Sequence, residues 1–209
     1  MKRLIAVISI LCVGYTANSN LALAASVSSN AIPVSAAVAN TLALDVIIKQ
    51  NSTTGATLAS GNFGTLQPFV QANGGKTLRS SVAGSTGTST VVILASGTFN
   101  GGTGYTITST GTPLTSGANT LPTGACTIVP TYNAADNGGA ILVGAVGASG
   151  SWTGAGAKTL YTSNATGSSR TITSFMSITD DPAAGATTAV PFDQAAGTYN
   201  GTITFTITA

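Results

Sequence analysis

The sequence contains no histidine and no glutamate, and these two absences exclude several kinds of catalytic site. Without histidine there is no Ser–His–Asp triad, no Cys–His pair and no zinc site built on imidazole. Without glutamate, a catalytic carboxylate pair would have to come from aspartates alone. The glycine-rich segment at residues 101–104 lacks the lysine and the following helix of a phosphate-binding loop. The sequence therefore predicts a protein that is not an enzyme.

Charge is also scarce, because Asp, Glu, Lys and Arg together make up 6% of the residues, against about 25% in ordinary soluble domains. No basic stripe is present that could neutralise phosphates, so no nucleic-acid partner is expected. The polar residues are mainly Thr, Ser, Asn and Gly. Since surface charge normally prevents association, such a surface suits packing against copies of the same chain. A neutral, hydroxyl-rich coat on a secreted monomer is the alternative interpretation.

The N-terminal segment has the pattern of a secretory signal peptide over residues 1–24. A basic start at Lys2 and Arg3 precedes an apolar run, and the segment closes on a small-residue cleavage site around Ala24. The apolar run is shorter than the roughly 20 residues that span a bilayer. We therefore expect an exported protein, extracellular or at the cell surface, without a transmembrane segment after cleavage. The cleaved chain would carry five basic and five aspartate side chains and be formally neutral.

Cysteine is limited to two residues, and Cys12 lies within the predicted signal peptide. Cys126 then remains alone and cannot form an intrachain disulfide. It lies beside Ile128 and Val129, which favours a buried small apolar residue over an intermolecular link. A hydrophobic core must therefore hold the fold together.

Apolar residues recur at every second position in two long segments, which is the pattern of a half-buried strand. One segment runs from Val34 to Ile48, and the other runs from Tyr199 to Ile207 with threonines between. Shorter strand signals occur in between, at residues 91–94, 105–108, 141–146, 160–161 and 172–178.

Turn residues such as Asn73-Gly74-Gly75 and Asn137-Gly138-Gly139 separate these segments, and the 26 glycines disfavour long helices. Roughly eight to ten short strands predict an all-β fold. We expect a single antiparallel β-sandwich, immunoglobulin-like or jelly-roll-like, over residues 39–209.

The sequence offers two candidate ligand sites. Asp180 and Asp181 offer carboxylate oxygens suited to Ca²⁺, with a solvated turn before Pro182 as the alternative. Trp152 lies in a glycine-rich stretch and is the candidate aromatic platform for a ligand, with a place in the core as the alternative. No other cofactor is expected.

The two ends of the chain resemble secreted bacterial pilin-like subunits. The segment from Ala195 to Thr208 is similar to the closing strand of spore-coat-U-type and chaperone–usher-like families, with its Gly-x-Tyr-x-Gly-Thr pattern. Residues Asn62 to Leu66 are similar to a Phe-Gly segment near the start of such domains. The chain departs from spore-coat-U-type subunits in having no second cysteine to pair with Cys126. The resemblance implies assembly by strand donation, in which a segment of one subunit completes the sheet of the next.

Residues 25–38 are the candidate donor segment for such an assembly. Its inserting side chains would be Val27, Ala31, Val34, Ala36 and Val38. In the alternative interpretation, this segment is the first strand of its own sandwich. The expected function is an exported structural subunit that forms a surface filament or coat with copies of itself. The alternative is a secreted monomeric binding module for carbohydrate or another surface ligand.

Overall fold

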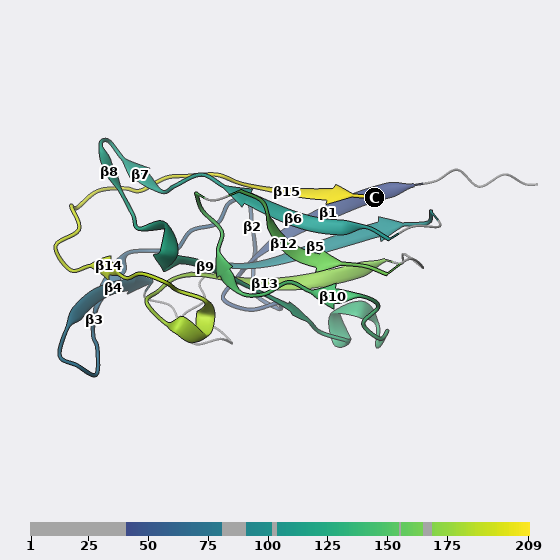
Figure 1. Cartoon of the computed structure of the whole chain (residues 1–209), viewed down its shortest axis with the longest axis horizontal. Helices are drawn as coiled ribbons and strands as arrows, with labels where there is room; N and C mark the ends of the chain where they lie inside the picture. Colours follow the sequence, from purple (N-terminus) through teal and green to yellow (C-terminus); the bar gives the residue numbers. More distant parts are fainter. Residues whose placement is uncertain (1–40, 81–90, 102–103, 155, 165–168) are drawn as a thin grey trace, which may run out of the picture. The chain divides into compact units, whose positions relative to one another are not determined.

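A computed structural model describes residues 41–80, 91–101, 104–154, 156–164 and 169–209, and this part of the chain is mostly β-structure (Figure 1). All named strand pairs are antiparallel. Two sheets enclose the hydrophobic core, so the predicted all-β sandwich is confirmed.

The larger sheet has six strands in the order β11-β9-β13-β5-β1-β2. The long strands β1 and β5 pair over nine positions, which fixes the register of this sheet. β13 lies between β5 and β9, where it is hydrogen-bonded on both edges and almost wholly buried. The strands are β1 Leu42–Gln50, β2 Thr57–Leu58, β5 Val91–Phe99, β9 Cys126–Tyr132, β11 Gly150–Ser151 and β13 Arg170–Ile178.

The facing sheet has four strands in the order β10-β12-β6-β15. β6 is its central long strand and pairs with β12 on one edge and with β15 on the other. The strands are β6 Thr106–Gly111, β10 Ala145–Val146, β12 Lys158–Thr162 and β15 Ile203–Thr208.

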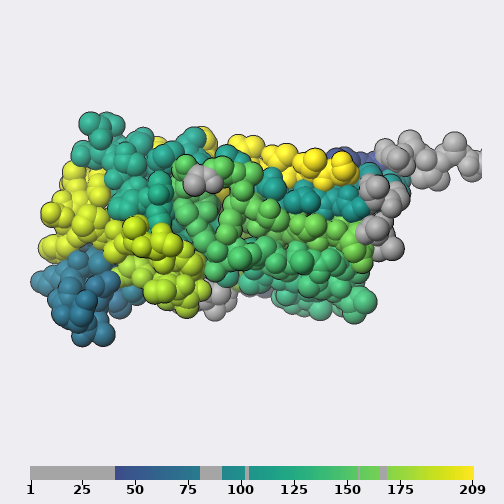
Figure 2. All heavy atoms as spheres, in the orientation of Figure 1, coloured from purple at the N-terminus to yellow at the C-terminus, as the bar shows by residue number. Residues whose placement is uncertain are grey.

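The remaining elements are short. A hairpin of β3 and β4 forms a third sheet with β14, and it projects beside the segment that follows β13 (Figure 2). A further ribbon joins β7 to β8, and three single 3₁₀ turns complete the described part. Their bounds are β3 Leu66–Val70, β4 Lys76–Ser80, β7 Thr115–Ser116, β8 Asn119–Thr120, β14 Val190–Pro191, η1 Thr123–Ala125, η2 Ala135–Asn137 and η3 Pro182–Ala184. None of the helices among the described residues has the length and apolar character needed to cross a bilayer.

The core contains inward-facing side chains of both sheets. Ile93 and Ile172 from the larger sheet and Ile107 and Leu160 from the smaller one are at most 1% exposed. Burying one such side chain stabilises the fold by about 1.5–3 kcal/mol. The sandwich therefore depends on the contact between its two sheets rather than on disulfides, as the lack of paired cysteines predicted.

The strand predictions agree best with the structure in the segments where apolar and polar residues alternate over the longest stretch. Along the whole of β15, half-buried apolar residues alternate with exposed threonines, beginning with Ile203 and Thr204, as predicted. In the predicted strand from Val34 to Ile48, the described residues form a strand from Leu42 onward, and residues 34–40 lie outside the described part.

One strand prediction was wrong in detail. The run at residues 141–146 forms a strand only at Ala145–Val146, and Ile141 is 77% exposed. Its glycine adopts a positive φ, which breaks an extended chain. The turn predicted at Asn137-Gly138-Gly139 is present, because Gly138 and Gly139 both adopt a positive φ directly after η2.

Candidate functional site

The first candidate site is the open side of the sandwich, where β1 and β15 lie side by side at the edges of the two sheets (Figure 1). β15 is hydrogen-bonded to β6 along one edge, and no described residue pairs with its other edge. On its outer edge, β1 pairs with β2 only at Ile48 and Lys49. Among the described residues, each sheet therefore has backbone groups without a strand partner along this side, which we call the β1–β15 seam.

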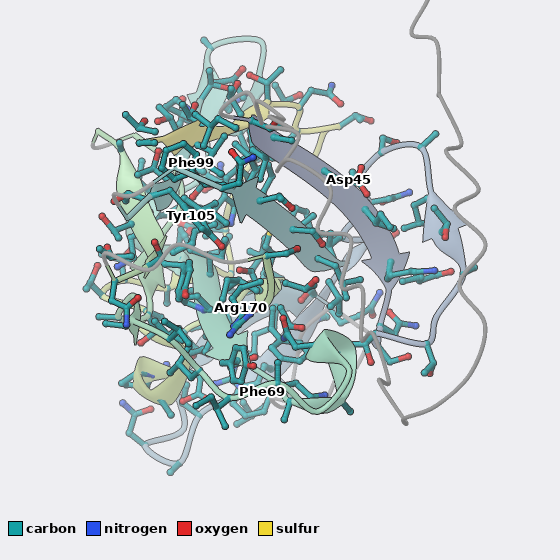
Figure 3. The ribbon with its side chains drawn as sticks, turned by 90° about the vertical axis from the view of Figure 1, so that its right-hand side faces the viewer. Asp45, Phe69, Phe99, Tyr105 and Arg170 are labelled. Atoms are coloured by element: carbon teal, nitrogen blue, oxygen red, sulfur yellow. The ribbon has the colours of Figure 1, made fainter. Side chains whose placement is uncertain are left out.

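The seam is also the place where the core is least covered. Half-buried apolar side chains from β1 and β15 face inward there, whereas their equivalents in central strands are fully buried. Asp45, between two of these positions on β1, points to solvent (Figure 3). The half-buried set comprises Leu44, Val46, Ile48, Ile203, Phe205 and Ile207. An extended segment that added to this edge could bond the free backbone and cover these side chains.

The order of the long strands shows which position in the sandwich the seam occupies. An immunoglobulin-type sandwich has sheets ABED and CFG. In chain order, β1, β5, β6, β9, β13 and β15 correspond to A to F, since β1-β5-β13-β9 reproduces ABED and β6-β15 reproduces CF. β12, on the far edge of β6, is an addition to this scheme. Among the described residues, no strand takes the G position beside β15.

The second candidate site is a polar cluster around Asp180, directly after β13. Its carboxylate accepts hydrogen bonds from Gln71 Nε2 at 2.6 Å and Thr77 Oγ1 at 2.9 Å, and it forms a salt bridge with Arg79 Nε. The three donors lie on the β3–β4 hairpin, so the cluster ties that hairpin to the end of β13. Burial acts to raise the pKa of Asp180, but the bonds from Arg79, Gln71 and Thr77 outweigh it and lower the pKa below its ordinary value.

These contacts correct the calcium interpretation of Asp180 and Asp181. The oxygens of Asp180 already accept three bonds, and Asp181 caps η3 by accepting from the amide of Ala183 at 2.9 Å. In the described part of the chain, no three His, Cys, Asp or Glu side chains cluster as metal ligands would. The alternative of a solvated turn is also incomplete, because the Asp180 side chain is only 3% exposed.

Trp152 is not an exposed platform, which corrects that interpretation too. It is 4% exposed and its ring stacks on Phe63 with the centroids 5.9 Å apart. Gly111 allows this packing, since a Cβ there would lie 2.3 Å from the Trp152 carbonyl oxygen. The glycine-rich stretch around Trp152 suggested an exposed indole, whereas Gly111 on another segment lets the chain pack directly against it.

Cys126 is buried in β9 and free of any disulfide, as predicted. Burial raises the pKa of its thiol to about 12, so the reactive thiolate is not populated near neutral pH.

The hairpin residues were missed by the sequence interpretation. A signal was present, because Asn73-Gly74-Gly75 was identified as a turn and apolar residues precede it. Gly74 does adopt the positive φ of a tight turn. Nothing in the sequence, however, connects Arg79 to Asp180, which lies 101 residues further along the chain.

The predicted donor residues Val27, Ala31, Val34, Ala36 and Val38, and the signal peptide before them, lie outside the described residues. Their placement therefore stays a prediction.

No family model, curated protein or solved structure matches this chain. The likeness to pilin-like subunits rests on the segments Ala195 to Thr208 and Asn62 to Leu66 alone.

Proposed function

We propose that this chain is an exported structural subunit that assembles with copies of itself into a surface filament or coat by β-strand donation. The observation that carries the proposal is the β1–β15 seam, in which an edge that no described strand covers runs along half-buried apolar side chains. A strand edge without a partner promotes association with another strand, and exposed apolar side chains gain free energy when they are buried. Both properties of the seam therefore favour the binding of an added strand.

The proposed occupant of the seam is the segment 25–38 of a neighbouring copy. Its apolar residues fall at even positions from Val34 to Val38, so one face of an extended strand would present them together. That face would cover Phe205 and Ile207, while its backbone would pair with the free edge of β15. The donor would thereby take the G position of the sandwich.

Donation of this kind is directional, so the expected assembly is a filament. Each subunit would give its N-terminal segment to one neighbour and receive a segment from another. Such a head-to-tail contact continues indefinitely unless its rotation closes a ring. The low charge of the chain favours this outcome, since few like charges would meet between neighbours.

The pattern at residues 1–24 supports export as part of the same proposal. A basic start, a short apolar run and a small-residue cleavage site would direct the chain out of the cell. Cleavage after Ala24 would leave the donor segment at the free N-terminus, where a neighbour could reach it. In a cell with two membranes, the subunit would cross the periplasm on its way to the surface.

The first prediction concerns removal of the donor segment from the mature protein. A variant that starts at Ala39 is expected to remain folded and monomeric, because residues 41–209 include both sheets and the described core. The mature protein that starts at Ala25 is expected to sediment as polymers and to form fibres in negative-stain electron microscopy. Polymers of undiminished length from the shortened variant would contradict the proposal.

A synthetic peptide of residues 25–38 tests directly whether this segment binds the seam. Added to the shortened variant, it is expected to bind and raise the melting temperature, because it occupies the seam. Replacing Val34 and Val38 by Asp should abolish binding, whereas Ser35→Asp on the opposite face should preserve it. On the acceptor, Phe205→Ala should weaken binding more than the matched Thr206→Ala, since Phe205 faces the seam and Thr206 faces solvent.

A further inference from the structure

A shallow hollow of about 380 Å³ lies beside the turn end of the β3–β4 hairpin, remote in the sequence and the sheet order from the β1–β15 seam. Phe69 and Arg79 line one part of it and Asp180 and Pro182 another. Phe69 is 39% exposed although its ring is large and apolar, and Figure 3 shows it well apart from the core residues Phe99 and Tyr105. The chain thus presents an aromatic surface beside a polar cluster.

Arg79 is held rigidly in this hollow. Its guanidinium carbon lies 3.4 Å from the centroid of the Phe69 ring, and its Nε is fixed by the salt bridge to Asp180. Asp180 is in turn held by Gln71 and Thr77. No described residue accepts a hydrogen bond from the two terminal nitrogens of Arg79, although the side chain is only 18% exposed. The hollow therefore offers a planar, prearranged set of N–H donors next to an aromatic ring.

The charge of the cluster indicates what kind of ligand it would accept. Arg79 and Asp180 neutralise each other, and Lys76 lies on the other face of the hairpin, 5.6 Å from the ring of Phe192. An anionic ligand would meet the Asp180 carboxylate, and a cationic one would meet the guanidinium. A neutral ligand rich in hydroxyl groups avoids both costs, because hydroxyl oxygens accept from the guanidinium and hydroxyl hydrogens can donate to nearby amide oxygens.

We propose that this hollow binds a neutral sugar ring, such as one unit of a surface polysaccharide. The apolar C–H groups of the sugar would pack on the part of the Phe69 ring that Arg79 leaves uncovered. Hydroxyl oxygens of the same sugar would accept from the terminal nitrogens of Arg79, and the amide of Asn73 at the rim would bond a further hydroxyl. The site is distinct from the proposed assembly seam, so the subunit could hold a glycan while it is part of a filament.

The test is a ¹H–¹⁵N NMR titration of the shortened variant that starts at Ala39, once its fold has been verified, and of the mature protein if it stays dispersed. The probes are the methyl glycosides of glucose, galactose, mannose and N-acetylglucosamine, with galacturonic acid as the charged comparison. We expect millimolar binding of at least one neutral glycoside, with shifts centred on Gln71 and Asn73. Phe69→Ala and Arg79→Lys should each weaken that binding at least about tenfold, because they remove the stacking surface and the planar fork.

Val70→Ala is the matched control. Val70 neighbours Phe69 and is 61% exposed, but its side chain lies on the opposite face of β3, so sugar binding should be unchanged. Thermal unfolding of each variant separates lost binding from lost structure. No binding of any neutral glycoside, preference for galacturonic acid, or an equal loss in Val70→Ala would each overturn the proposal. None of these results depends on whether the chain forms filaments.

Discussion

Replacing Asp180 with alanine is expected to lower the free energy of unfolding by about 3 kcal/mol. The carboxylate is the common acceptor for Gln71, Thr77 and Arg79, and its side chain is 3% exposed. Its removal leaves three donors without their partner, one of them a positive charge that is 18% exposed. The β3–β4 hairpin would then be tied to the sandwich mainly by its apolar side. Urea unfolding of the mature or shortened protein, followed by tryptophan fluorescence, measures the change.

Asp181→Ala is the control for this prediction because it removes the adjacent carboxylate. Asp181 accepts one bond, from Ala183, at the start of a single 3₁₀ turn. Its loss should cost about 1 kcal/mol or less. Equal effects of the two substitutions would show that Asp180 does not anchor the hairpin.

The same carboxylate makes stability depend on pH in the acid range. The pKa of Asp180 is lower in the folded protein than its ordinary value, since the hydrogen bonds and the Arg79 charge outweigh burial. Its contribution is therefore fully present above the unfolded pKa of about 3.9 and is lost as the pH falls through the lower, folded pKa. The difference in unfolding free energy between wild type and Asp180→Asn should thus shrink below about pH 4. A difference that stays constant from neutral pH to pH 2 would contradict this.

The parts of the fold that could be predicted are those coded by local alternation. β15 and most of β1 have a period of two, which directly gives the strand and its buried face. Cys126 was assigned to the core from its apolar neighbours, and the structure agrees. The turn at Asn73 and Gly74 was likewise readable, because few residues other than glycine tolerate a positive φ.

The parts that could not be predicted depend on contacts between distant segments. Asp180 appeared as half of an acidic pair because its neighbour in sequence is an aspartate, whereas its partner in space is Arg79. Trp152 was ambiguous because whether an indole is buried depends on which strand passes over it, here the segment of Phe63. The β1–β15 seam was invisible for the same reason. It exists only once β1 and β15 have been placed at the edges of facing sheets.

Replacing Tyr161 with alanine is expected to lower the free energy of unfolding by about 3–5 kcal/mol. Tyr161 is fully buried in β12, and its ring meets that of Tyr105 edge to face, with centroids 5.6 Å apart. Tyr105 in turn donates a hydrogen bond at 3.0 Å to the carbonyl of Gly97 in β5 of the facing sheet. The aromatic pair therefore joins the two layers of the sandwich, and a cavity there would weaken contacts in both.

Tyr161→Phe separates the ring from its hydroxyl group. The hydroxyl donates to the carbonyl of Val143, and losing that bond should cost only about 1 kcal/mol. Since small domains are stable by about 5–15 kcal/mol, the alanine variant should lose a large share of its stability and the phenylalanine variant little. Urea unfolding of both variants measures the two effects. If they were equal, the hydroxyl bond rather than the packed ring would hold β12 in place, and the sheets would have to be joined mainly by the aliphatic side chains around Ile107 and Ile172.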